Sequence, residues 1–470
     1  MKRPNDAGIA LITTLWIIAI LSILITAYLY ETRLDWRISR GAIVKTQAEY
    51  AAKAGIAQFQ AVLEEDDDAY DDAQEDWGQG VNGQLEDPVG SGKVFSYSVS
   101  ATDLNSLIDI NSADETVVRS LLGSAGVPEE SRSTLAQNIV SARGDRPFLT
   151  PGDLARVEGM TNAILYGAQA APAEGEEAQQ TTPLINLISV YSVDKNEQSN
   201  GTSRTNITSA DANTLRQNLT NAGGEELLSQ NEAEALVSYR DENDLESIGD
   251  LFDAPAITDE TLDDVRDELS TDDSDDTSDE TTNINSASAD ELANIDGLDQ
   301  GTAEAIVRYR EENGNYDSVD DIQNAPIFTR TEIQQIADKI TVTDDETLTG
   351  VLNLNTAGAD ALALLPNMNN QKAQAIVNRR QAQQASTERQ SPGAEEAPSS
   401  NPFRSIGDLL EIDSIDEETF KEIANLVTYR AQAFQLTASG MDPAGTEAAA
   451  VTAIIDRSGE EISVRFWRIE

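Results

Sequence analysis

The chain has 470 residues, enough for two or three domains of about 150 residues each, and it carries 84 acidic against 32 basic residues for a formal net charge of −52. Such a charge repels polyanions and disfavours free nucleic acid as a partner. Histidine and cysteine do not occur, which excludes imidazole catalysis, thiolate nucleophiles, His/Cys zinc sites and disulfides. Because the surplus carboxylates recur in every segment, we interpret them as adaptation to salt rather than as one acidic binding surface. Calcium capture by some of them stays open.

The N-terminus is interpreted as a short leader followed by a membrane-spanning helix. Residues 1–8 form a basic leader that ends in Gly8, and the apolar stretch 9–29 contains no charged residue. At about 1.5 Å of rise per residue, this stretch crosses a hydrocarbon core of about 30 Å as one helix. An ordinary secretory signal has a shorter apolar core and a cleavage site after it. The side chains expected in the membrane include Leu11, Leu15, Ile18, Leu21 and Leu24.

Residues 30–63 are expected to continue the same helix as an amphipathic segment. Apolar residues recur at helical spacing over 42–63, and no proline interrupts them. Gly41 and Gly55 are interpreted as soft points of this long helix. Its apolar face requires a partner surface.

A basic leader that ends in glycine, directly before an apolar helix that runs into a globular domain, resembles the type IV pilins and the pseudopilins of type II secretion systems. The resemblance implies cleavage by prepilin peptidase between Gly8 and Ile9 and methylation of the new amine. Most pilins carry glutamate at the fifth mature position, which here is Thr13. In this the chain resembles the general secretion pathway protein K family, large minor pseudopilins thought to cap the filament. A tip subunit has no preceding amine to neutralise, so a buried carboxylate there would be uncompensated.

The same resemblance implies a location and a set of partners. The chain would be a single-pass protein of the inner membrane with its body in the periplasm, and its partners would be other minor pseudopilins, the inner-membrane secretion platform and prepilin peptidase. Some family members bind calcium, but no ligand set in this sequence assigns the residues. Charge alone does not decide the orientation, since basic residues flank the span on both sides, at 2–3 and at 33–40. An uncleaved signal anchor of a generic membrane protein and a minor subunit of a type IV pilus are the alternatives.

The predicted fold class is α+β, a pilin-like long N-terminal transmembrane helix with a small antiparallel sheet, interrupted by a large, mainly α-helical insertion. Residues 64–92, rich in Asp, Glu and Gly, are interpreted as an acidic loop. Alternating apolar and polar residues place the sheet in segments 93–102 and 430–470. The insertion would then follow the first strand. The four expected strands are 94–101, 434–438, 449–455 and 462–469.

The insertion repeats one motif four times. Each copy opens with Asn, Ser or Thr residues that are expected to cap a helix, with an acidic residue in its first turn. The spacing of the later elements resembles paired helix-hairpin-helix units. The helical repeats 1 to 4 occupy residues 103–168, 204–269, 283–346 and 351–429. Between or within them lie a strand or connector without an evident partner at 184–193, an acidic linker at 270–282 and a low-complexity insertion at 381–401.

Helix-hairpin-helix units often bind DNA, because a Gly-apolar-Gly hairpin lets backbone amides approach phosphate. Repeat 3 keeps the hairpin glycine Gly297 but has Asp299 where the second glycine belongs, followed by Gly301. A carboxylate aimed at a phosphate is repulsive, so we interpret the repeats as packing modules. A membrane-anchored DNA receptor of the competence type is the alternative.

The sequence contains no nucleophile elbow and no phosphate loop, and acidic pairs are too frequent for one to stand out. We therefore expect no enzymatic activity and no obligatory cofactor. The prediction is a minor pseudopilin that caps the pseudopilus tip and aids its assembly for protein export across the outer membrane.

Overall fold

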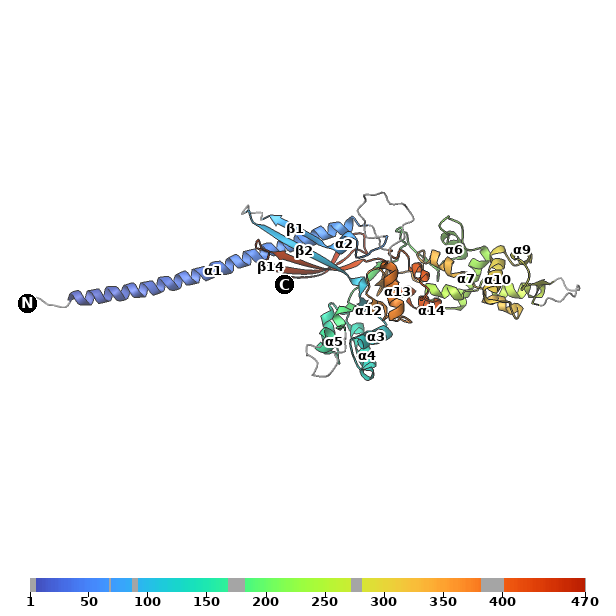
Figure 1. Ribbon diagram of the computed structural model, residues 1–470, viewed down its shortest axis with the longest axis horizontal. Helices are drawn as coiled ribbons and strands as arrows, with labels where there is room; N and C mark the ends of the chain where they lie inside the picture. Colours follow the sequence, from blue (N-terminus) through green and yellow to red (C-terminus); the bar gives the residue numbers. More distant parts are fainter. Residues whose placement is uncertain are drawn as a thin grey trace, which may run out of the picture.

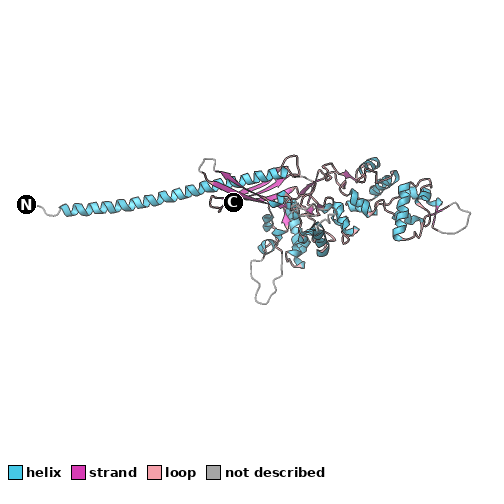
Figure 2. Cartoon of the chain, turned by 45° about the horizontal axis from the view of Figure 1, so that its top comes forward, coloured by secondary structure: helices cyan, strands magenta, loops and turns pink. Residues whose placement is uncertain are grey.

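The computed structural model describes residues 6–66, 69–86, 92–167, 182–271, 281–381 and 401–469. Helix α1 (Asp6–Glu64) is one rod of 59 residues that projects from one end of the molecule (Figure 1). The C-terminal part of α1 lies on a β-sheet, and the helical insertion extends beyond the sheet, away from the N-terminus (Figure 2). Residues 1–5 of the expected leader, and most of the expected linkers at 270–282 and 381–401, lie outside the described residues.

Five antiparallel strands form the sheet, in the order β1–β2–β13–β14–β15. All four predicted strands are confirmed to within a few residues. The loop predicted over 64–92 is wrong for its second half, which contains helix α2 (Asp76–Gln79) and edge strand β1. The insertion therefore follows the second strand. The strand bounds are β1 (Val81–Glu86), β2 (Val94–Asp103), β13 (Ala433–Met441), β14 (Glu447–Asp456) and β15 (Ser463–Ile469).

Helix α1 packs on one face of this sheet through small residues that allow a close approach. A Cβ atom on Gly440 of β13 would lie 1.8 Å from the carbonyl oxygen of Ala48, and one on Gly55 would lie 2.6 Å from the Tyr97 ring. Gly55 is thus a packing position rather than the soft point predicted for it. The packed face begins near Val44, so residues 30–43 of the predicted amphipathic segment are exposed. The buried side chains of α1 are Ala48, Ala51, Ala52, Ile56, Phe59 and Leu63.

The four repeats of the insertion share one order of elements: a two-residue strand, two helices joined by a hairpin, a 3-10 turn, a further helix and a closing strand. Repeat 1 contains β3 (Ile108–Asp109), α3 (Glu115–Ser124), α4 (Glu129–Asp145), η2 (Pro151–Arg156), α5 (Asn162–Tyr166), η3 (Leu184–Asn186) and β4 (Ile188–Ser189). Repeat 2 contains β6 (Thr205–Asn206), α6 (Ala212–Asn218), α7 (Gln230–Glu242), η4 (Ile248–Asp253), α8 (Asp259–Val265), η5 (Arg266–Glu268) and β7 (Leu269–Ser270). Repeat 3 contains β8 (Thr282–Asn283), α9 (Ala289–Leu292), α10 (Gln300–Asn313), η6 (Val319–Asn324), α11 (Arg330–Ile336) and β9 (Ile340–Thr341). Repeat 4 contains β11 (Leu352–Asn353), α12 (Ala359–Leu362), α13 (Asn370–Gln381), η7 (Ile406–Glu411), α14 (Glu417–Ile423), η8 (Ala424–Leu426) and β12 (Val427–Thr428).

The opening strands of repeats 2 and 3 each pair with the closing strand of the other repeat. In repeats 1 and 4 the opening strand pairs in parallel with the closing strand of the same repeat, β3 with β4 and β11 with β12. In repeats 2 and 3 the partners are exchanged, because β6 pairs with β9 and β8 pairs with β7. The apolar residues follow the same exchange, since Leu262 and Val265 of α8 are buried in one cluster with repeat 3. Repeats 2 and 3 therefore form one module.

The sequence showed no pairing partner for segment 184–193, and the structure shows two partner strands. Strand β4, within this segment, pairs with β3 and is the closing strand of repeat 1. Strand β5 (Val193–Lys195) begins at the last residue of the segment and pairs with β10 (Thr347–Thr349), just before repeat 4. The connector thus ties the first repeat to the fourth.

The opening motif was predicted to cap its helix with Asn, Ser or Thr. This is confirmed in repeat 3, where Ser288 caps α9, whereas in repeat 2 the cap is Asp211, the acidic residue expected in the first turn. Asn285 instead bridges two backbone segments, because its Nδ2 donates to the Tyr316 carbonyl at 3.0 Å and its Oδ1 accepts from the Tyr316 amide at 2.8 Å. An arginine from the second helix donates to a carbonyl of the opening motif in every repeat, which fixes that helix against the strand. These arginines are Arg143, Arg240, Arg310 and Arg380.

Candidate functional site

The apolar half of α1 is the first candidate site, an anchor in a membrane. Its most apolar 18-residue window has a mean hydropathy of 2.3 and none of it is buried, so this helix is long and apolar enough to cross a membrane. The hydroxyls in this half bond to their own helix: Ser22 donates to the Ile18 carbonyl and Thr26 to the Ser22 carbonyl, both at 2.7 Å. These polar groups would enter hydrocarbon already satisfied. The side chains expected in the membrane are all exposed: Leu11, Leu15, Ile18, Leu21 and Leu24.

The residues of the expected processing site lie at the start of this rod. Gly8 and Ile9 are in the first turns of α1, which begins at Asp6, and Thr13 follows a turn later. The segment from Ile9 to Tyr30 contains no carboxylate. A positive amine placed beside this segment in lipid would therefore find no acidic partner on it.

The second candidate site is an acidic cluster where α1 ends. Asp66, Asp71 and Glu75 each place a carboxylate oxygen within 4.8 Å of the others. The Arg457 guanidinium pairs with Asp66 at 2.8 Å and also with Asp71. Burial raises the pKa of Asp71 well above its usual range, and burial raises the pKa of Glu75 to about 7. Three carboxyl groups thus lie together with one guanidinium, and a divalent cation bound to their oxygens would favour the ionised forms that burial disfavours.

Beside this cluster, a buried carboxylate joins the sheet to repeat 4. Asp103, at the end of β2, accepts hydrogen bonds from Asn353 Nδ2 at 3.0 Å, from the Asn105 amide at 2.8 Å and from the Thr356 hydroxyl. Burial raises its pKa to about 6 despite these bonds. The same Asn353 amide donates to the Asp71 carbonyl at 3.4 Å, so one network connects the acidic cluster, the sheet and the insertion.

A second buried network holds the connector against the last repeat. Arg430, which is 2% exposed, pairs with Asp194 at 3.1 Å and donates to the Lys195 carbonyl at 2.7 Å and the Glu197 carbonyl at 3.0 Å. Sequence reasoning missed both networks. Their members are single polar residues in a chain with 84 acidic residues, and only the fold brings them together.

The hairpin of repeat 3 is the third candidate site, where a DNA-binding relative would present amides to phosphate. Gly297 has φ +105°, which only glycine adopts easily, and Asp299 caps α10 by accepting from the Thr302 amide at 2.9 Å. Asp299 also accepts from the Asn231 amide of repeat 2 at 3.4 Å. A Cβ atom on Gly301 would lie 2.6 Å from the Glu232 carboxylate. The hairpin glycines and Asp299 thus serve contact with repeat 2.

Repeat 4 keeps the hairpin shape without glycine. Asn367 has φ +54° and occupies the place that Gly297 holds in repeat 3. Asn369 then caps α13, accepting from the Gln371 and Lys372 amides at 2.9 and 3.0 Å. Asparagine tolerates the left-handed conformation better than other non-glycine residues, which explains how the motif survives the loss of glycine.

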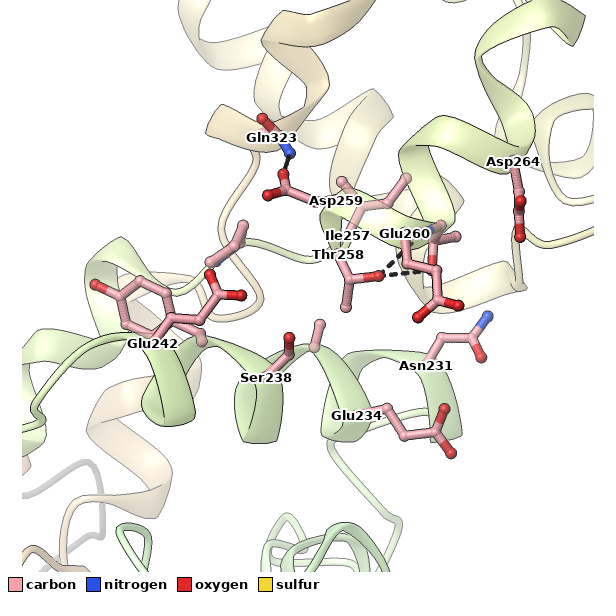
Figure 3. A pocket seen from close by; sticks show the side chains of 14 residues that line it. Asn231, Glu234, Ser238, Glu242, Ile257, Thr258, Asp259, Glu260, Asp264 and Gln323 are labelled. Atoms are coloured by element: carbon pink, nitrogen blue, oxygen red, sulfur yellow. Dashed lines mark hydrogen bonds between the residues drawn. The ribbon is translucent and has the colours of Figure 1, made fainter.

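An acidic groove lies between α7 and α8 (Figure 3). Asn231, which lines it, also donates to the carbonyl of Gly297 in the repeat 3 hairpin at 3.4 Å. The Thr258 hydroxyl accepts from the Thr261 amide at 3.0 Å and so begins α8, while Gln323 donates to Asp259. None of the described residues that line the groove is basic. A phosphate would meet repulsion here from both the groove and the hairpin. The carboxylates that line it are Glu234, Glu242, Asp259, Glu260 and Asp264.

Comparison with known proteins gives a local match and a distant structural one. Residues 278–341 match a family model described as a helix-hairpin-helix motif. ComE operon protein 1 of Bacillus subtilis (strain 168) is 40% identical over 60 residues, which are 13% of this chain and 29% of that protein. The chain thus spans less than a third of the length of this curated relative. A chain in a crystal structure of the GspK–GspI–GspJ complex of the enterotoxigenic Escherichia coli type 2 secretion system aligns over 94% of this chain and 99% of that one, with 9% identity and a TM-score of 0.33.

Proposed function

We propose that the chain is a minor pseudopilin of a type II protein secretion system, without catalytic activity, that caps the pseudopilus tip. The observation that carries the proposal is the single helix α1. Its segment from Leu11 to Tyr30 is apolar, exposed and free of carboxylates, and its second half packs on an antiparallel sheet at the close approach of Ala48 and Gly440. One rigid rod can therefore carry a membrane anchor and a globular body without a flexible joint between them.

The proposed assembly begins with processing of the leader. Prepilin peptidase would cut between Gly8 and Ile9 and methylate the new amine, and α1 would then pack beside the helices of other minor pseudopilins in the inner membrane. Thr13 supports a place at the tip. A subunit with no preceding neighbour has no amine to neutralise, and a carboxylate at that depth would be a buried, unpaired charge.

The insertion supports a capping role through its size and rigidity. It contains four repeats, tied to the sheet by Asp103 and to the connector by Arg430, so it would stay above the rod rather than swing away. A body of this size in the periplasm leaves no room for a further subunit directly above it. Contact with the inner-membrane secretion platform is part of the same proposal.

Calcium binding is proposed for the acidic cluster at the end of α1. Asp66, Asp71 and Glu75 would hold the ion, and the ion would supply positive charge that Arg457 alone does not match. The expected result is a rise in melting temperature on adding calcium to protein treated with EDTA. That rise should disappear in the Asp71→Asn/Glu75→Gln variant and persist in Asp259→Asn/Glu260→Gln, which removes two charges from the acidic groove. An equal rise in both variants would contradict the assignment.

The competence-type DNA receptor is the second candidate, and the local match to a helix-hairpin-helix motif is the observation in its favour. Against it stand Asp299 at the hairpin and the carboxylates of the neighbouring groove. We expect no binding of duplex DNA at 0.15 M salt. A micromolar affinity that falls with rising salt would revive this alternative.

The test of the proposed function is the mature N-terminus. Mass spectrometry of the protein from cells with prepilin peptidase should show a chain that begins at methylated Ile9, and from cells without it a chain that begins at Met1. The Gly8→Ala change, which alters only the cleavage site, should block processing while Gly41→Ala does not. Protein that keeps Met1 in the presence of the peptidase would refute the pseudopilin assignment and favour a generic signal anchor. Co-purification with subunits of a type IV pilus, and not with secretion pseudopilins, would favour that alternative.

A further inference from the structure

The charges on α1 just beyond the apolar span are sorted onto opposite sides of the helix. With 3.6 residues per turn, Arg33, Arg37 and Arg40 fall within about 60° of one another around the axis. Glu31 and Asp35 lie within about 40° of each other and are centred about 180° from the arginines. We call these the basic flank and the acidic flank. Together they span about 14 Å along the helix, and they overlap from residue 33 to residue 35.

This arrangement of charges lowers the stability of the helix when it stands alone. Arg33 and Arg37 are four residues apart, as are Glu31 and Asp35, so like charges stand one turn above each other and repel. No acidic residue lies three or four positions from any of the three arginines. Among the described residues, no ion pair is found for either flank, and the Arg40 guanidinium instead stacks on Trp36 at 5.3 Å. Opposite charges three or four residues apart would instead stabilise an isolated helix.

Both flanks are open to a neighbour. Every residue from 31 to 43 is exposed, because the contact with the sheet begins only near Val44. Around the axis, the basic flank lies about a quarter turn from Ala52, at the centre of the face that packs on the sheet. The acidic flank lies about a quarter turn to the other side. A second helix can lie along either flank over the exposed residues 31–43, but on the basic side it must end before Ala51 and Gly55, which lie in the same direction around the axis and pack on the sheet.

We propose that the basic flank docks the juxtamembrane helix of another pilin-type subunit through acidic residues on that helix. This rests on the proposed function, which places similar rods side by side. Charge complementarity selects the occupant. Anionic lipid headgroups would satisfy the three arginines, but at the same depth they would repel Glu31 and Asp35 on the opposite flank. Neighbouring helices satisfy both flanks at once, one on each side.

The experiment uses the absence of cysteine from the chain. Full-length protein with Gly41→Cys, a position open on all sides that lies about 70° around the axis from the centre of the basic flank and directly follows Arg40, is produced in membranes together with each other pilin-type subunit of the same secretion system. Each of those subunits carries one cysteine in the first turns after its own apolar span. Disulfide formation is then measured. Ala42→Cys, near the centre of the acidic flank, reports on the opposite side.

We expect Gly41→Cys to form a disulfide with a subunit that is acidic at this height. The yield should fall at least tenfold with Arg33→Glu/Arg37→Glu/Arg40→Glu and return when the acidic residues of that subunit are changed to arginine. The matched control is Arg119→Glu/Arg156→Glu/Arg266→Glu, which makes the same change in net charge on exposed parts of the insertion and should leave the yield unchanged.

Three results would overturn the inference. The yield could be insensitive to the charge reversal. The disulfide yield could fall on charge reversal without returning when the partner's acidic residues are changed to arginine. If flotation of the charge-reversed protein with phosphatidylglycerol vesicles falls as well, lipid is the occupant of the basic flank. Equal disulfide formation between two copies of this chain would make a second copy the occupant. If no pilin-type subunit forms a disulfide at either position, and the N-terminus is also unprocessed, the proposed function itself fails.

Discussion

Replacing Gly440 with alanine tests how α1 is joined to the body. The new Cβ atom would lie 1.8 Å from the Ala48 carbonyl oxygen and 2.6 Å from its carbonyl carbon, so it meets backbone, which cannot rotate out of the way. The helix and sheet must separate by more than an ångström. A gap of that size forfeits a quarter to a half of the dispersion energy of the atoms across it, and overpacking of this kind costs about 3 kcal/mol.

The assay is unfolding by urea followed through Trp77 fluorescence. Trp77 is 3% exposed and lies 5.1 Å from the Phe434 ring, so its emission reports on the region between α1 and the sheet. The control is Gly41→Ala in the exposed part of the same helix, where nothing lies within 4 Å of the new methyl group. We expect it to be stabilising by about 0.8 kcal/mol, from helix propensity alone. A Gly440→Ala protein within 0.5 kcal/mol of the wild type would refute the close approach that we describe.

Three further predictions concern the buried polar groups and the repeat contacts. The pKa of Asp103 is about 6 in the folded protein and 3.8 unfolded, so the folded state binds the proton more tightly and stability falls as pH rises from about 4 to 6. Asp103→Asn should remove about 2 kcal/mol of the difference in stability between pH 4.5 and pH 7.5, as measured by melting curves at the two pH values; an unchanged slope would contradict the burial of the charge. Arg430→Met leaves Asp194 buried without its partner and should cost about 3–5 kcal/mol, whereas the double change with Asp194→Leu should recover most of this loss in the same melting assay. Gly301→Val should weaken the contact with Glu232 and raise amide hydrogen exchange in repeats 2 and 3 together, while an effect confined to repeat 3 would contradict their mutual closure.

Elements with a strong hydrophobic pattern could be predicted from the sequence. The apolar run from Ile9 and the alternation in Val94–Asp103 each carry one uniform pattern, and the helix and the strand predicted from them are both confirmed. Strand β1 was missed because Val81 and Leu85 are its only large apolar residues and its other neighbours are polar, as is typical of an edge strand.

The sequence was not sufficient for pairings between similar segments. Repeats 2 and 3 open with nearly the same motif, and their closing strands Leu269–Ser270 and Ile340–Thr341 have two residues each. Local preference is therefore the same for pairing within a repeat and for pairing across repeats, and only packing decides between them. Asp66, Asp71 and Glu75 were missed for a related reason, since carboxylates are so frequent that proximity in space leaves no trace in the sequence.

The exchange of closing strands between repeats 2 and 3 limits how the helical insertion can lose or gain repeats during evolution. A deletion of one of these repeats would remove the present partner of β6 or β8, and the remaining opening and closing strands would have to pair within one repeat, as they do in repeats 1 and 4. Shortened relatives should therefore lose repeats 2 and 3 together more readily than one of them alone, with the breakpoints before β6 and after β9.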